Sequence, residues 1–79
     1  MWCVYIIQSL KTSKYYIGAT SNFEKRIQRH NSGQNVSTRF GKPWKLVYKE
    51  DHLSKFHAFA REKQIKSYKG GNAFKKLFN

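Results

Sequence analysis

The sequence predicts a single small α+β domain over residues 1–79. Two runs rich in β-branched and aromatic residues, 2–8 and 14–20, flank a short polar connector, which is typical of a β-hairpin. A third alternating run covers 44–50, and segments with helical spacing precede and follow it. A chain of this length has room for one modest core and excludes a second folded unit.

The predicted hairpin carries two tyrosines that can share one face of the sheet. Side chains alternate along a strand, so Val4 and Ile6 point to one face and Tyr5 to the other. The second strand can place Tyr16 on the Tyr5 face, with Gly18 leaving room beside the rings. A slip of one residue in register would remove this arrangement. Tyrosine also favours strands in general, so an ordinary structural role is the alternative.

The segment after the hairpin predicts a helix. Asn22 is a suitable N-cap, and Gly33 suits the left-handed position at the C-terminal end. Phe23 begins a stripe that faces the core, and Arg26 and His30, four residues apart, form a second stripe beside it.

Residues 34–43 form a polar connector that is long for a small domain, and long loops are often functional. Arg39 in this loop could contact phosphate, or it could be a solvated arginine. The following strand, 44–50, is predicted to direct every second residue to one face, namely Trp44, Leu46 and Tyr48.

A second helix is predicted from an N-cap at Ser54 to about residue 69. Its apolar side contains Ala58, Phe59 and Ile65, and Glu62 falls on the same side. A carboxylate that leans inward needs a cation or a metal ion, because burying it unpaired is costly. The sequence leaves both partners open, and the candidate cations for an ion pair are Arg26, Arg61 and Lys66.

Gly70-Gly71 interrupts the helical pattern near the C-terminus. Asn72 is predicted to cap a last short helix over residues 73–78, whose apolar side chains would close the core.

The charge balance points to a polyanionic partner. Sixteen Lys and Arg against four Asp and Glu give a net charge of +12, and 16% aromatic residues argue against a disordered basic tail. A folded, strongly basic domain most often binds nucleic acid, and an acidic lipid surface is the alternative. The scarcity of carboxylates excludes a well-supplied two-metal nuclease site and leaves a single metal ion with one or two protein ligands.

Cysteine content and hydropathy indicate the cellular compartment in which the protein is expected. Cys3 is the only cysteine, so the chain has no internal disulfide and no cysteine-rich zinc site, and a small buried hydrophobe is the expected role. No apolar run reaches the length of a membrane span or a signal-peptide core. We therefore expect a cytoplasmic protein that does not enter a membrane.

Several short motifs, taken in order, resemble a GIY-YIG nuclease domain, and in particular its small stand-alone bacterial members. The resemblance covers nearly the whole chain. Its elements are Cys3-Val4-Tyr5, Tyr16-Ile17-Gly18, Arg26, His30, the strand from Pro43 to Tyr48, and Ala60-Arg61-Glu62 with Ile65-Lys66.

The resemblance implies a three-stranded antiparallel sheet with helices packed around it, in the order ββαβαα. It also implies hydrolysis of a DNA phosphodiester with one divalent cation, Mg²⁺ or Mn²⁺, held by Glu62. A tyrosine at Tyr16 or Tyr5 would help to activate the attacking water, and Arg26 would stabilise the phosphate. A phenol is a weak base at neutral pH unless nearby positive charge favours its ionised form.

We assign Tyr16 the base role, Tyr5 positioning or proton relay, and His30 the orientation of a phosphate or protonation of a leaving group. Nucleic-acid contacts are expected from four further residues, Arg39, Lys66, Lys69 and Asn72. The chain departs from the family pattern where Cys3 replaces the first glycine. Ala19-Thr20 also stand where some relatives have a lysine after the second motif.

Two other classes of function compete with the nuclease. One is a basic nucleic-acid-binding module with weak or lost catalysis, whose affinity would fall steeply with salt. The other is an adaptor that delivers a partner to DNA through Phe40 and Trp44, if these side chains are exposed. The chain shows no second domain for site selection, so a nuclease of this kind would take its targeting, in repair or recombination, from DNA shape, charge or a partner protein.

Overall fold

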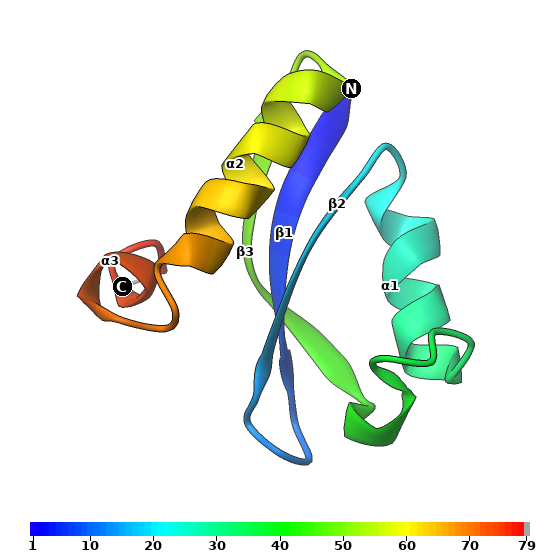
Figure 1. Cartoon of the computed structure of the whole chain (residues 1–79). Helices are drawn as coiled ribbons and strands as arrows, with labels where there is room; N and C mark the ends of the chain where they lie inside the picture. The colour runs from blue at the N-terminus through cyan, green and yellow to red at the C-terminus, as the bar shows by residue number, and fades with distance from the viewer. Residues whose placement is uncertain (79) are drawn as a thin grey trace.

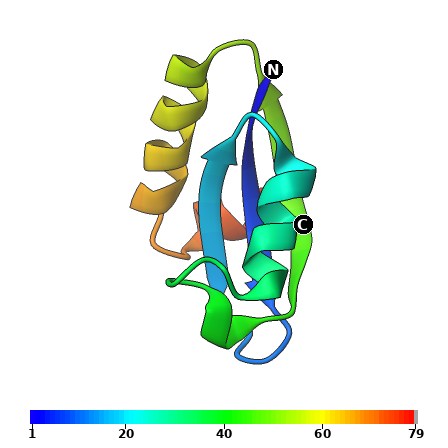
Figure 2. The same ribbon diagram turned by 90° about the vertical axis from the view of Figure 1, so that its right-hand side faces the viewer.

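A computed structural model describes residues 1–78 and contains a three-stranded antiparallel sheet with helices on both faces (Figures 1 and 2). The first strand lies in the middle of the sheet, in the order β2-β1-β3. The strands are β1 (Trp2–Ser9), β2 (Tyr15–Thr20) and β3 (Trp44–His52). The helices are α1 (Phe23–Ser32), α2 (Lys55–Ser67) and α3 (Asn72–Lys75), with a 3₁₀ turn at Arg39–Gly41. The predicted α+β class and the order ββαβαα are confirmed.

The register of the hairpin places both tyrosines on one face of the sheet. Tyr5 pairs with Gly18, and Ile7 pairs with Tyr16, so Tyr5 and Tyr16 share a face as predicted. A Cβ atom at Gly18 would overlap the hydroxyl oxygen of Tyr5, which is fully buried. Glycine is therefore the residue that lets the Tyr5 ring lie across β2.

The sheet separates two small cores. Helix α2 covers the face that β1 lines with Val4 and Ile6, and this core also contains Ala19, Ala58, Ile65 and Phe74. The opposite face, under α1, contains Cys3, Tyr5, Ile7 and Trp44. Cys3 is buried there, as expected for a small hydrophobe.

A bulge in β3 changes the predicted alternation. Ile7 pairs with Leu46 but Ile6 pairs with Tyr48, so Val47 is an extra residue on β3. Leu46 therefore lies on the α1 face and Tyr48 on the α2 face. The predicted common face with Trp44 is confirmed for Leu46 and wrong for Tyr48, because alternation fails across the extra residue.

The ends of α1 agree with the sequence. The Asn22 side chain accepts a hydrogen bond from the Lys25 backbone N–H (3.1 Å), and Gly33 adopts a left-handed conformation with φ of +83°. Both ends are thus fixed by local chemistry, which orients the two stripes of α1 toward the sheet.

The C-terminal helices differ slightly from the prediction. Ser54 caps α2 as expected, but the helix ends at Ser67 because Lys69 and Gly70 have positive φ. Asn72 is the first residue of α3, and no side chain caps that helix. The prediction of Asn72 as an N-cap is therefore wrong. Within residues 1–78, no helix combines the length and apolar character needed to cross a membrane.

Candidate active site

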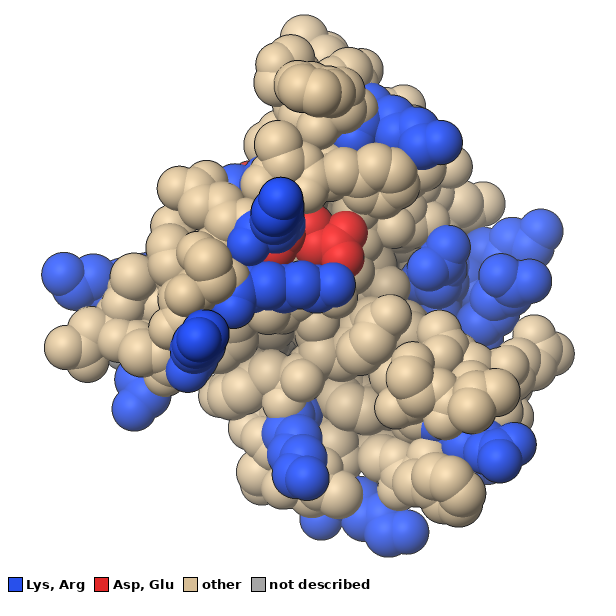
Figure 3. Space-filling model, in the orientation of Figure 1, with Lys and Arg blue, Asp and Glu red and all other residues tan. Residues whose placement is uncertain are grey.

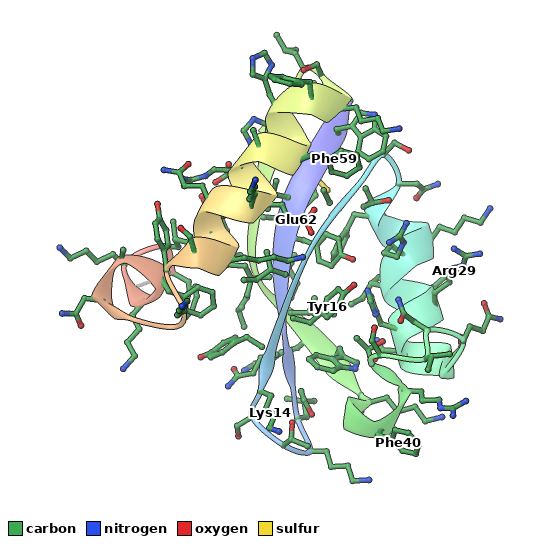
Figure 4. The ribbon with its side chains drawn as sticks, in the orientation of Figure 1. Lys14, Tyr16, Arg29, Phe40, Phe59 and Glu62 are labelled. Carbon is green, nitrogen blue, oxygen red and sulfur yellow. The ribbon has the colours of Figure 1, made fainter. Side chains whose placement is uncertain are left out.

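The candidate site lies across the edge strand β2, between the two long helices. Figure 4 shows Tyr16 on β2 between Glu62 of α2 and Arg29 of α1. An edge strand has no neighbour on its outer side, so side chains from helices on opposite faces of the sheet can approach each other around it.

A buried chain of hydrogen bonds ties β1 to α1 and to the loop that follows α1. The Tyr5 hydroxyl lies 3.0 Å from His30 Nε2, and His30 Nδ1 lies 2.7 Å from the Thr38 hydroxyl oxygen. Tyr5 and His30 are completely buried, and Thr38 nearly so. The Thr38 hydroxyl can donate onward to the Asn35 carbonyl (3.5 Å), which makes Thr38 the acceptor for His30 Nδ1–H and His30 Nε2 the acceptor for Tyr5.

Burial keeps the rings of Tyr5 and His30 in this hydrogen-bond network in their neutral forms. Removal from water raises the pKa of Tyr5 well above its ordinary value near 10, and the neighbouring Tyr16 adds to this, while Arg26 opposes it. Burial lowers the pKa of His30, and the positive charge of Arg26 lowers it further. At neutral pH, Tyr5 is therefore a protonated donor and a poor base.

Tyr16 differs from Tyr5 in being partly exposed. Its ring centroid lies 4.9 Å from that of His30 and 6.4 Å from that of Trp44. These contacts fix the ring by packing and leave it at the surface of the site. Of the two tyrosines, Tyr16 is the one that a substrate can reach.

The α1 side of the site is strongly basic. Arg26 is half-buried and Arg29 is exposed, and both line two hollows of about 350 and 480 Å³ that run along α1. Lys25 lines the first of these hollows. Arg26 is predicted from the sequence and Arg29 is not. Arg29 follows Arg26 by three residues, which places the two side chains on neighbouring parts of the helix surface.

Glu62 provides the acidic part of the site. Its side chain is 19% exposed, and one carboxylate oxygen lies 2.7 Å from the Lys66 ammonium nitrogen. Figure 3 shows a small acidic area in the centre of this face, with Lys and Arg side chains around it, at the position where Figure 4 labels Glu62. The inward lean predicted from the helical wheel is confirmed, and Lys66 is the cation that pairs with Glu62.

A family model for the GIY-YIG catalytic domain matches residues 1–75. The chain belongs to the GIY-YIG family. It is 41% identical over 66 residues to a UPF0213 protein of Staphylococcus haemolyticus, a match that covers 82% of this chain and 79% of the relative. UPF0213 proteins of Staphylococcus saprophyticus and Staphylococcus aureus are 38% and 36% identical over the same shares of both chains.

The matched model describes a catalytic domain, and the GIY-YIG family is a family of endonucleases. Membership therefore supports hydrolase chemistry on a DNA substrate. GIY-YIG nucleases generally depend on a divalent metal ion.

The donors of this GIY-YIG domain suit an ion with few protein ligands. Within residues 1–78, no group of three or more His, Cys, Asp or Glu side chains is placed to hold a metal. Glu62 offers a carboxylate that is partly open to solvent and paired with one flexible lysine. Mg²⁺ commonly binds in this way, through one or two carboxylates while keeping several water ligands. The residues present therefore fit a single hydrated ion.

Not all predicted contact residues of the GIY-YIG domain lie together. Arg39 lies on the 3₁₀ turn with its guanidinium 5.1 Å from the centre of the Phe40 ring. Lys69 and Asn72 are exposed at the start of the C-terminal segment, and Figure 1 shows α3 on the far side of the sheet from α1. By contrast, Tyr16, Arg26 and Glu62 all lie near enough to the Tyr5 hydroxyl to influence its pKa and form the compact part of the site, and Lys69 and Asn72 lie outside it.

The burial of His30 predicts a pH dependence of stability. The pKa of His30 is lowered in the folded protein, whereas in the unfolded chain it is near 6.5. As pH falls below about 6.5, the unfolded chain takes up this proton before the folded protein does, so the free energy of unfolding decreases. Urea denaturation between about pH 7 and 5 should show this loss, and His30→Gln should flatten it. His57→Gln, at an exposed histidine, should leave the slope as in wild type; equal slopes in all three proteins would contradict the assignment.

Proposed function

We propose that this protein is a metal-dependent DNA endonuclease that hydrolyses phosphodiester bonds at the site across β2. The observation that carries the proposal is that a phenol, an arginine and a partly exposed carboxylate, Tyr16, Arg26 and Glu62, all lie close enough to the Tyr5 hydroxyl to influence its pKa. Hydrolysis of a phosphodiester needs a base for water, positive charge near the phosphate oxygens and a ligand for a cation, and this set provides all three.

In the proposed mechanism, Glu62 would hold a single Mg²⁺ or Mn²⁺ ion. When bound, such an ion offsets the charge that develops on the phosphate oxygens. Arg26 would bind the same phosphate through its planar fork of donors, and Arg29 would extend the contact along α1. Lys66 would balance the Glu62 charge when no ion is present.

Tyr16 is proposed as the base. As a phenolate, Tyr16 would take a proton from water while the water oxygen bonds to phosphorus and the bond to the leaving oxygen breaks, and the leaving oxygen would then take a proton from solvent. The high pKa of buried Tyr5 argues against Tyr5 for this step and favours a positioning role. Full burial of His30, with both ring nitrogens hydrogen-bonded, likewise favours positioning of Tyr5 and Tyr16 over direct contact with phosphate.

The rest of the basic surface would hold the DNA backbone. With a net charge of +12, phosphate contacts from Arg39, Lys66, Lys69 and Asn72 would add sequence-independent affinity that decreases with salt. We further propose that the protein acts in the cytoplasm, and that work in repair or recombination would use a partner protein for targeting.

A nicking assay tests the proposal. Wild-type protein is incubated with supercoiled plasmid and with a branched duplex, in Mg²⁺, in Mn²⁺ and in chelator. We expect cleavage in at least one metal and none in chelator. Binding without cleavage on every substrate and metal would instead support a nucleic-acid-binding module, in which the Glu62–Lys66 contact is an ordinary ion pair.

A further inference from the structure

We propose that a hollow beside the active site binds an unpaired DNA base close to the cleaved phosphate. The hollow has a volume of about 220 Å³ and is lined by Thr12, Lys14, Ser37, Phe40, Gly41 and Trp44. It is separate from the hollows along α1 that Arg26 and Arg29 line. The proposal rests on the proposed nuclease function and adds a preference for the structure of the substrate.

The first observation is that Phe40 is exposed on a backbone that is held in place. The residue is 74% exposed, although the 3₁₀ turn that carries it is hydrogen-bonded to the core on both sides. The Ser9 hydroxyl donates a hydrogen bond to the Gly41 carbonyl, and the Trp44 indole N–H donates to the Thr38 carbonyl (2.8 Å). The backbone on either side of Phe40 is thus fixed, so the ring is presented to solvent at little further cost in entropy.

The second observation is the chemistry around the ring. Arg39 lies over Phe40, and Lys14 lines the same hollow together with the polar residues Thr12 and Ser37. Figure 4 shows Lys14 and Phe40 at the end of the molecule below Tyr16. An aromatic face next to cations is the combination that proteins use to stack a base while holding its phosphate. A purely apolar protein partner would instead leave these two cations desolvated.

The hollow shares residues with the hydrogen-bond network of Tyr5, His30 and Thr38 and lies next to Tyr16. Trp44 forms its inner wall and packs against Tyr16, with ring centroids 6.4 Å apart. Thr38, whose carbonyl holds the Trp44 indole, also bonds His30 through its hydroxyl. A base in the hollow would therefore lie one aromatic ring away from Tyr16, on a nucleotide near the scissile phosphate.

An unpaired base is favoured because a paired base has both faces stacked in the duplex and would first have to be unstacked. A single strand, a frayed end or a branch point offers a free base face to Phe40 without that cost. The hollow is also too small for a duplex. The structure thus favours a substrate in which the strand next to the cleavage site is open.

Binding in the presence of chelator tests this proposal without any need for cleavage. Fluorescence anisotropy is measured with a labelled single strand, with the same strand in a duplex, and with a single strand that carries abasic sites. We expect Phe40→Ala to weaken single-strand binding by about 5- to 150-fold, which is the usual range for loss of one stacked base. Duplex binding should change by less than about twofold, and Phe40→Trp should restore the single-strand affinity.

Phe56→Ala is the matched control, because Phe56 is 77% exposed and lies on the first turn of α2, at the opposite end of the molecule in Figure 1. It should bind both DNA forms like wild type. Equal loss of affinity for single strand and duplex in Phe40→Ala would overturn the proposal. No loss of affinity for either DNA form would also overturn it, and would favour a protein partner as the ligand of Phe40. If the protein cleaves DNA but has no preference for binding single strands, this inference fails and the proposed nuclease function stands. If the protein does not cleave DNA but has a Phe40-dependent preference for single strands, the proposed nuclease function fails.

Discussion

Replacing Glu62 with glutamine is expected to lower the cleavage rate by about 10³-fold or more, since a metal ion contributes several kcal/mol to stabilising a phosphoryl transition state. The free energy of unfolding should change by less than about 1 kcal/mol, because a helical ion pair with an exposed partner contributes little. Lys66 is 55% exposed, so Glu62 has no buried cation to lose. The measurements are initial rates of plasmid nicking in Mg²⁺ and Mn²⁺, and urea denaturation of the same samples.

Glu50 provides a matched control with the opposite expectation. Its side chain is also 19% exposed, but it is bound by Arg61 (3.0 Å), by His52 (2.6 Å) and by the Tyr48 hydroxyl. Although burial raises its pKa, these hydrogen bonds prevail and the net effect lowers the pKa of Glu50. Glu50→Gln should therefore lower the free energy of unfolding by about 1–3 kcal/mol and leave cleavage per folded molecule close to wild type.

The pair of substitutions separates a metal ligand from a structural carboxylate. If both variants lose activity only in proportion to the fraction that is folded, Glu62 is a structural residue and the metal assignment fails. If Glu62→Gln loses activity while remaining folded, the loss lies in chemistry or metal binding. A rise in the metal concentration needed for half-maximal activity in any residual cleavage would then identify metal binding.

The parts of the site that follow from local rules could be predicted from the sequence. The common face of Tyr5 and Tyr16 follows from strand alternation and a short hairpin, and the observed register agrees. The ends of α1 follow from Asn22 and Gly33, and these caps orient Arg26 and His30. The inward lean of Glu62 follows from its place on the helical wheel beside Ala58.

The parts that depend on loop conformation or on a choice between equivalent partners could not be predicted. Thr38 lies in a ten-residue polar connector, and nothing in its sequence indicates that its hydroxyl reaches His30. The sequence offers Arg26, Arg61 and Lys66 equally as partners of Glu62, whereas in the structure Arg61 pairs with Glu50 and Lys66 pairs with Glu62. Phe40 and Trp44 look alike in sequence, yet only Phe40 is exposed, so Trp44 belongs to the core and not to a contact surface.

Substitution of Tyr16 by phenylalanine is expected to lower the cleavage rate by about 10²- to 10⁴-fold, which is the usual contribution of a positioned base. The phenylalanine ring keeps the contacts with His30 and Trp44, so stability and DNA affinity in chelator should remain near wild type. Single-turnover cleavage rates of wild type and Tyr16→Phe provide the measurement.

Tyr5→Phe is the comparison that tests the assignment of Tyr16 as the base, because it removes the other tyrosine hydroxyl on the same face of the sheet. That hydroxyl is fully buried and bonded to His30, so its loss leaves a buried nitrogen without its donor and should cost about 1–3 kcal/mol of stability. Cleavage by the folded fraction should fall less than in Tyr16→Phe. If instead Tyr16→Phe retains full activity and Tyr5→Phe abolishes it, the base is Tyr5. Its pKa would then have to fall greatly when substrate and metal bind, because burial in the free protein holds that pKa above its ordinary value.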